Sequence, residues 1–98
     1  MVIVTGSVHA RPDAIDEVLA LSLEHVRRSR TEPGCLLHSV HQDVEDPLHV
    51  VFLEHWADEA ALTVHFGVPA SADFVTRLAD LTDGRPAIQI YEATPAVL

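Results

Sequence analysis

The chain has 98 residues, a formal net charge of −9 and a hydrophobic fraction of 48%, which is enough apolar material for one packed core. The acidic balance disfavours nucleic acid as a partner, because negative charges repel the phosphate backbone. No apolar run approaches a membrane span, and the first residues lack the basic start of a signal peptide. We therefore expect a single cytoplasmic domain over residues 1–98 that binds neither membranes nor nucleic acid.

Missing residue types narrow the chemistry further. All six basic residues are arginines, so a lysine Schiff base and a phosphate-binding Walker loop are excluded. Cys35 is the one cysteine, which excludes an intrachain disulfide and a multi-cysteine metal site. No glycine-rich dinucleotide fingerprint is present. We expect no cofactor.

The first half of the chain predicts a strand, a helix and a hairpin. Residues 2–10 are rich in β-branched side chains and predict the strand. Apolar residues at helical spacing follow, with Asp13 as the expected N-cap. Pro33 and Gly34 then predict a turn, since Pro fixes φ and Gly accepts positive φ. Strands are expected over residues 35–43 and 48–56, paired as an antiparallel hairpin.

The second half predicts two helices and a last strand. Asp58 is expected to cap a short helix that runs to His65. Residues 71–81 form another helical pattern, and residues 86–93 form a final strand. The order β-α-β-β-α-α-β predicts an α+β fold of the ferredoxin-like split type. Its antiparallel sheet would be covered by helices on one face.

The predicted strand over residues 48–56 is apolar on both sides. Phe52 and Trp56 fall on one side, and Val51 and Leu53 fall on the other. Because helices of the same chain cover only one face, the other face needs a partner. A second copy is the simplest cover, so we predict a homodimer packed through the sheets.

Seven histidines raise the question of a metal site. His38 and His41 are three apart on one strand and therefore lie on opposite faces. No His-x-His and no His-x-x-x-His helical pair occurs. A site assembled from separate elements, with His9, His41 and His65 as candidates, stays open as an alternative. We expect dispersed, individually hydrogen-bonded histidines and no metal.

His65 is the titratable residue with the most interesting surroundings. Trp56, Phe66 and Phe74 are near enough in the expected fold to shape an apolar cavity around it. Burial would lower its pKa and the helix C-terminus would raise it, so the direction stays open. Such a histidine could take a proton from an acidic substrate, or could simply bond a strand backbone. Glu54 occupies an unusual inward-facing strand position.

Three segments together resemble the antibiotic biosynthesis monooxygenase superfamily. They are Glu32-Pro33-Gly34-Cys35-Leu36, Phe52-x-Glu54-x-Trp56-x-Asp58 and Ala61-Leu62-x-x-His65. The resemblance covers essentially the whole chain. It implies a dimeric ferredoxin-like α+β barrel with a pocket between the sheet and the helices.

The resemblance also implies a cofactor-free oxygenase for a small aromatic phenol, anthrone or quinol. In that chemistry the deprotonated substrate reduces dioxygen directly, and the protein supplies a dry cavity and a base. The implied base is His65, with Ser7 or His9 as orienting donors. The implied pocket residues are Phe52, Glu54, Trp56, Phe66 and Phe74.

Three other functions are weighed beside this one. A haem-degrading branch of the superfamily uses Asn, Trp and His where this chain has Ser7, His65 and Val75, so haem degradation is disfavoured. Another branch isomerises a phosphorylated ketone, for which Arg11 or Arg77 would have to bind the phosphate. The third is a dimer that binds a small molecule without turnover.

Overall fold

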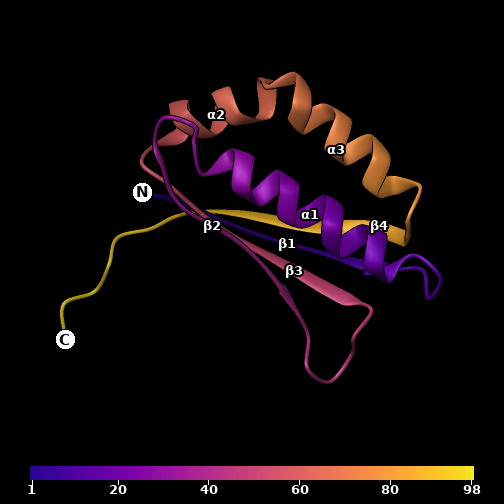
Figure 1. The fold of residues 1–98 in the computed structure, drawn as a ribbon. Helices are drawn as coiled ribbons and strands as arrows, with labels where there is room; N and C mark the ends of the chain where they lie inside the picture. The colour runs from indigo at the N-terminus through magenta and orange to yellow at the C-terminus, as the bar shows by residue number, and fades with distance from the viewer.

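The computed structural model describes residues 1–98 as a four-stranded sheet with three helices on one side (Figure 1). The elements in chain order are β1 (Val2–Ala10), α1 (Ile15–Ser29), β2 (Cys35–Gln42), β3 (His49–Trp56), α2 (Glu59–Gly67), α3 (Pro69–Ala79) and β4 (Thr82–Glu92). The strands lie in the order β2-β3-β1-β4 and pair antiparallel throughout. The predicted α+β ferredoxin-like fold is confirmed, and the sheet of one chain is open rather than closed into a barrel. None of the helices combines the length and apolar character needed to span a bilayer.

Gly34 fixes the turn between α1 and β2. Its φ is +82°, in the region that other residues avoid. A Cβ at this position would lie 2.5 Å from the Cβ of Ala61 in α2. The backbone conformation and the close approach of α2 both therefore require glycine, as the Pro-Gly pattern predicted for the turn.

The helix starts differ in part from the sequence expectation. Asp58 caps α2 as predicted, because its carboxylate accepts a hydrogen bond of 2.8 Å from the backbone N–H of Ala61. Asp13 does not cap α1: Ala14 occupies the N-cap position without any side-chain bond, and Asp13 lies 3.5 Å from Arg11 instead. Pro69 opens α3, where its missing N–H costs nothing.

Strand β4 begins at Thr82, four positions before its predicted start. Its pairing with β1 shifts between Ser7 and His9, so β4 carries extra residues across this irregularity. Gly84 lies within it at φ +69°. Asp83 and Gly84, which precede the predicted strand, are therefore part of a bulged strand.

Cross-strand register assigns each residue to a face of the sheet. Val4 pairs with Glu54, and Gly6 pairs with Phe52, on the face that the helices cover. The apolar core lies on this face, where alternate residues of β1 and β3 are buried. Thr5 and Leu53 pair on the open face, where side chains are half-buried or exposed. The predicted division of β3 into two apolar sides is confirmed.

Candidate functional site

Three histidines meet beneath the helices. His25 comes from α1, His38 from β2 and His65 from α2, and their exposed fractions are 6%, 2% and 3%. One ring nitrogen from each lies within 4.8 Å of the others. Buried polar side chains of this kind are uncommon and need partners, so the surroundings of each ring decide its chemistry.

Glu54 faces this histidine cluster from β3. Its Oε1 lies 3.3 Å from Nε2 of His38 and 3.8 Å from Nε2 of His65. The same oxygen accepts a hydrogen bond of 2.9 Å from the indole N–H of Trp56. Burial raises the pKa of Glu54, but the contacts with His38 and Trp56 lower it by more, so its pKa is below the ordinary value. The site thus holds a buried carboxylate that favours its charged form.

Glu32 orients the ring of His65. Nδ1–H of His65 donates a hydrogen bond of 2.7 Å to Oε1 of this carboxylate, which lies at the turn after α1. The bond places the proton on Nδ1 and leaves the lone pair on Nε2 free. The ring of Trp56 packs against His65 with centroids 4.6 Å apart. A carboxylate-oriented imidazole against an aromatic wall can accept a proton at Nε2.

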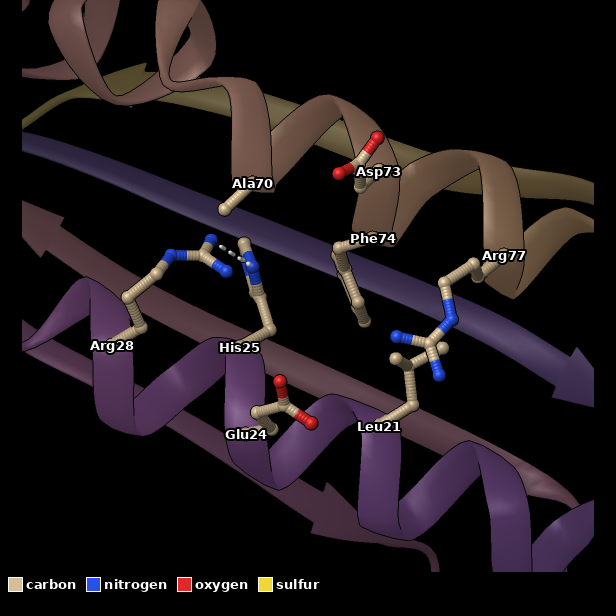
Figure 2. Close-up of a pocket in the computed structure, with 8 residues that line it drawn as sticks. All are labelled: Leu21, Glu24, His25, Arg28, Ala70, Asp73, Phe74 and Arg77. Atoms are coloured by element: carbon tan, nitrogen blue, oxygen red, sulfur yellow. Dashed lines mark hydrogen bonds between the residues drawn. The ribbon is translucent and has the colours of Figure 1, made fainter.

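His25 forms the side of the cluster nearest α3. Its ring stacks on Phe74 with centroids 3.9 Å apart and planes inclined by 7°. Nη2 of Arg28 donates a hydrogen bond of 2.8 Å to Nδ1 of His25 (Figure 2). Burial, followed by the positive charge of neighbouring His38 and Arg28, lowers the pKa of His25 to about 3. His25 is therefore neutral at physiological pH.

A cavity of about 120 Å³ lies between α1 and α3, next to this ring. Figure 2 shows its lining: Leu21, Glu24, His25 and Arg28 from α1, with Ala70, Asp73, Phe74 and Arg77 from α3. The two arginines and two carboxylates balance in formal charge. His65 is absent from the lining, so His25 and Phe74 stand between this cavity and the Nε2 lone pair.

The predicted pocket residues lie in different surroundings. Phe52, Glu54, Trp56 and Phe74 are all buried on the helix-covered face, at or near the histidine cluster. Phe66, in contrast, is 48% exposed on α2, although its ring centroid lies 5.8 Å from that of His65. The structure therefore places Glu54 and Trp56 beside His65, with Phe66 next to it but partly exposed. Phe74 stacks on His25 instead, and Phe52 packs against Phe74.

The two predicted orienting donors lie elsewhere. By register, Ser7 pairs with Val51 and His9 with His49, on the face of the sheet opposite to His65. Nε2 of His9 bonds the carboxylate of Asp46 at 3.1 Å, at the exposed end of the sheet. The sheet itself separates Ser7 and His9 from the histidine cluster.

Sequence reasoning missed three members of the site. His25 falls at helical spacing from the apolar residues Val18 and Leu21, which could have marked it as buried. His38 alternates with Val40 on β2 and gave a comparable signal. Glu32 stood in a segment of the family motif, but its role could not be predicted because that role depends on the turn that places it beside α2.

The model of the antibiotic biosynthesis monooxygenase family matches residues 1–77. The chain belongs to this family. Among solved structures, a Deinococcus radiodurans protein provisionally named an antibiotic biosynthesis monooxygenase is 29% identical, with a TM-score of 0.94 over 100% of this chain and 97% of that chain. A second antibiotic biosynthesis monooxygenase is 34% identical, with a TM-score of 0.89 over 97% of this chain and 100% of that one.

An uncharacterised protein of Synechocystis sp. is 35% identical over 91 residues, which is 93% of this chain. This chain spans 62% of the length of that relative. Family membership thus establishes the fold and a kinship with monooxygenases, while the reaction of this chain has to be argued from its own residues.

Proposed function

We propose that this protein is a cofactor-independent monooxygenase that oxidises a small phenol or quinol with dioxygen. The observation that carries the proposal is the Glu32–His65 pair, whose free Nε2 lies in a buried aromatic setting. Family membership adds to it. His65 acts as the general base, and Glu32 keeps its ring in the tautomer that can accept a proton.

The proposed reaction uses the substrate as the reductant. His65 removes a proton from a quinol hydroxyl, and the resulting anion gives electrons to dioxygen. One oxygen atom enters the ring and the other leaves as water, so quinol plus dioxygen gives hydroxyquinone plus water. The substrate supplies all four electrons, and the buried site excludes water while the anion forms.

The cavity between α1 and α3 supports a single-ring substrate. Its volume of about 120 Å³ is well below the roughly 300–1,000 Å³ of pockets for drug-sized ligands. A one-ring quinol therefore suits the cavity better than a three-ring anthrone, and Arg28 or Arg77 at its lining would bind the phenolate oxygen. Rotation of Phe74 would join the cavity to His65.

Oxygen consumption tests the proposal directly. Chelator-treated protein would be given one-ring hydroquinones and three-ring anthrones in oxygenated buffer. We expect uptake above the protein-free rate, faster for the one-ring compounds, with hydroxyquinone as the product. Uptake equal to the protein-free rate across the panel would overturn the oxygenase proposal. A compound that raises the melting temperature and is recovered unchanged would instead identify a binding protein without turnover.

The proposal includes a homodimer formed through the open face of the sheet. Supporting it, this face carries partly exposed apolar side chains, among them Ile3, Leu53 and Tyr91, and no helix of the same chain covers them (Figure 1). Light scattering should give twice the mass of the chain. A Leu53→Asp substitution should return it to the monomer mass, because a buried unpaired charge is costly.

A further inference from the structure

The rings of the histidine cluster form a nearly equilateral triangle. The centroids of His25, His38 and His65 are separated by 5.3, 5.5 and 5.5 Å. Three imidazoles bound tetrahedrally to one ion, with metal–nitrogen distances of about 2.0–2.1 Å, would place their centroids about 5.2 Å apart. The ring centroids thus have nearly the spacing of a three-histidine metal site, and the ligating nitrogens, which lie within 4.8 Å of one another, would turn inward to the roughly 3.3 Å separation of tetrahedral ligands.

His38 supplies an independent observation. Its side chain is fully buried, and neither ring nitrogen has a hydrogen-bond partner of acceptable geometry. The 3.3 Å contact between its Nε2 and Glu54 is electrostatic but poorly aligned. A buried imidazole with both nitrogens unsatisfied is destabilising unless something absent from the chain binds it. An ion on Nε2 would satisfy this ring.

His65 is already arranged as a metal ligand. Its Nδ1–H donates to Glu32, and its Nε2 presents a lone pair to the interior of the cluster. A carboxylate on the outer nitrogen is the usual second partner of a metal-bound histidine, because it fixes the tautomer and raises the basicity of the other nitrogen.

Glu54 completes the donor set. Its Oε1 lies 3.3 and 3.8 Å from the Nε2 atoms of His38 and His65. Tetrahedral ligands at about 2.0 Å from zinc are about 3.3 Å apart, so these separations need only a small contraction. Trp56 donates to the same oxygen, which still has a second lone pair for an ion.

From this geometry we propose that His38, His65 and Glu54, with His25 as a further nitrogen donor, bind one divalent first-row transition-metal ion. Imidazole and carboxylate ligands in tetrahedral spacing fit zinc best among these ions. The inference goes beyond the proposed oxygenase, because it rests on ring positions and unsatisfied atoms and needs no turnover. An ion on Nε2 of His65 would occupy the lone pair that the base uses, and would therefore inhibit the oxygenase.

His25 joins the ion only after a local change. Arg28 donates to its Nδ1, so the proton of the neutral ring is on Nε2, where a ligand needs a lone pair. Moving that proton to Nδ1 requires Arg28 to turn away from the ring. Nη2 of Arg28 also donates a hydrogen bond of 3.2 Å to the hydroxyl of Ser71, so Arg28 would keep one hydrogen-bond partner after turning away. His25 lines the cavity between α1 and α3 and separates it from the other proposed ligands, so an ion from that side would reach the site only when the His25 ring moves.

Direct binding measurements test the site. The full chain, stripped with a chelator, would be dialysed against Zn²⁺ and analysed for metal, and separately titrated with Co²⁺. We expect about one zinc per chain, a raised melting temperature and the visible absorption of four-coordinate cobalt. Zinc at background level, or a cobalt spectrum of the hydrated ion, would overturn the proposal.

Two histidines of β2 provide a matched pair of variants. His38→Leu removes a proposed ligand, and His41→Leu removes an exposed histidine from the other face of the same strand. We expect His38→Leu to weaken zinc binding by more than about 100-fold, since even outer partners of a metal site are worth about 10–100-fold. His41→Leu should bind as the parent chain does. Equal binding by both variants would mean surface histidines hold the ion, and would refute the site.

Folding of the variants can be checked separately. His38→Leu removes an unsatisfied ring but also a contact of the buried Glu54 carboxylate, so circular dichroism would first confirm its metal-free fold. Glu54→Gln changes a different proposed ligand. Its fold would be confirmed by circular dichroism, and we expect it to lose zinc binding independently of His38. Loss of zinc binding by both folded variants would support the site, and retention by both would reject it.

The readouts keep the two proposals apart. Metal content and the cobalt spectrum are measured without substrate, and oxygen uptake is measured in chelator. Absence of zinc binding with chelator-resistant uptake would reject the metal site alone. One bound zinc with no uptake under any condition would reject the oxygenase alone.

Discussion

The two faces of the sheet carry the same residue type in opposite settings. On the helix-covered face, His38 is buried with His25 and His65, and their side chains expose little surface to solvent. On the open face, His9 and His49 each bond one carboxylate, at 3.1 and 3.0 Å, with rings a third to a half exposed. The difference shows that burial and convergence, rather than the number of histidines, create a site where imidazole chemistry is possible.

The largest expected difference between the buried and the exposed histidines is in enzymatic turnover. His65→Gln should reduce oxygen-dependent turnover by about 10²–10⁴-fold, because a general base contributes that much. His41→Gln, which changes an exposed histidine on the open face, should leave turnover unaltered. Steady-state oxygen uptake measures both variants. A loss below about threefold in His65→Gln would remove this residue from the role of base.

A second comparison concerns stability. Trp56 is fully buried on the helix-covered face, whereas Tyr91 on the open face is 46% exposed. Trp56→Ala should lower the free energy of unfolding by about 3–5 kcal/mol, through lost burial and a residual cavity. Tyr91→Ala should lower it by about 1–3 kcal/mol, because the proposed dimer buries this side chain. Urea unfolding measures both, and a change within about 0.5 kcal/mol in Tyr91→Ala would show that the open face is solvated.

The carboxylates that bond the Nδ1 atom of a histidine provide a test with a smaller expected effect. Glu32 orients His65, and Asp43 pairs in the same way with His49 on the open face. Glu32→Gln should weaken zinc binding by about 10–100-fold, because it loosens the ring that holds the ion. Asp43→Asn should have no effect on zinc affinity. Competition with a coloured chelator measures both, and equal affinities would argue against any role of Glu32 at a metal.

The smallest effect is on the pH dependence of stability. His25 has a pKa of about 3 in the folded chain, against 6.5 for a free imidazole. Below pH 6.5 the unfolded chain binds a proton here that the folded chain does not, so acid destabilises the metal-free fold progressively toward pH 3. His25→Phe, which keeps the stacking on Phe74, should flatten the fall in melting temperature between pH 6.5 and 5.

Local patterns were sufficient for most of the fold. The Pro33-Gly34 turn, the Asp58 cap and the alternation in β3 were each predicted, because they depend on short-range backbone preferences. The early start of β4 was not, since the bulge beside Gly84 satisfies a register imposed by β1. Asp13 failed as a cap because it lies within the turn before α1: Ala14 occupies the N-cap position, and Asp13 is left exposed beside Arg11.

The candidate site was predicted only in part. His65, Glu54 and Trp56 were identified and do lie together. Ser7 and His9 were expected beside them but face the other side of the sheet, because β1 alternates and presents Val4 and Gly6 to the helices instead. The family motif marks positions along the chain, and the side on which a strand residue projects is decided by register.

The sequence by itself determined the order of elements, the turn at Gly34 and the presence of an ionisable residue near the end of α2. Only the tertiary structure decided that His25, His38 and His65 converge with Glu54, and that Glu32 holds His65 from a turn. The physical reason is distance along the chain. Helical and strand periods place a residue on a face, but contacts between elements far apart in sequence depend on how whole faces pack together.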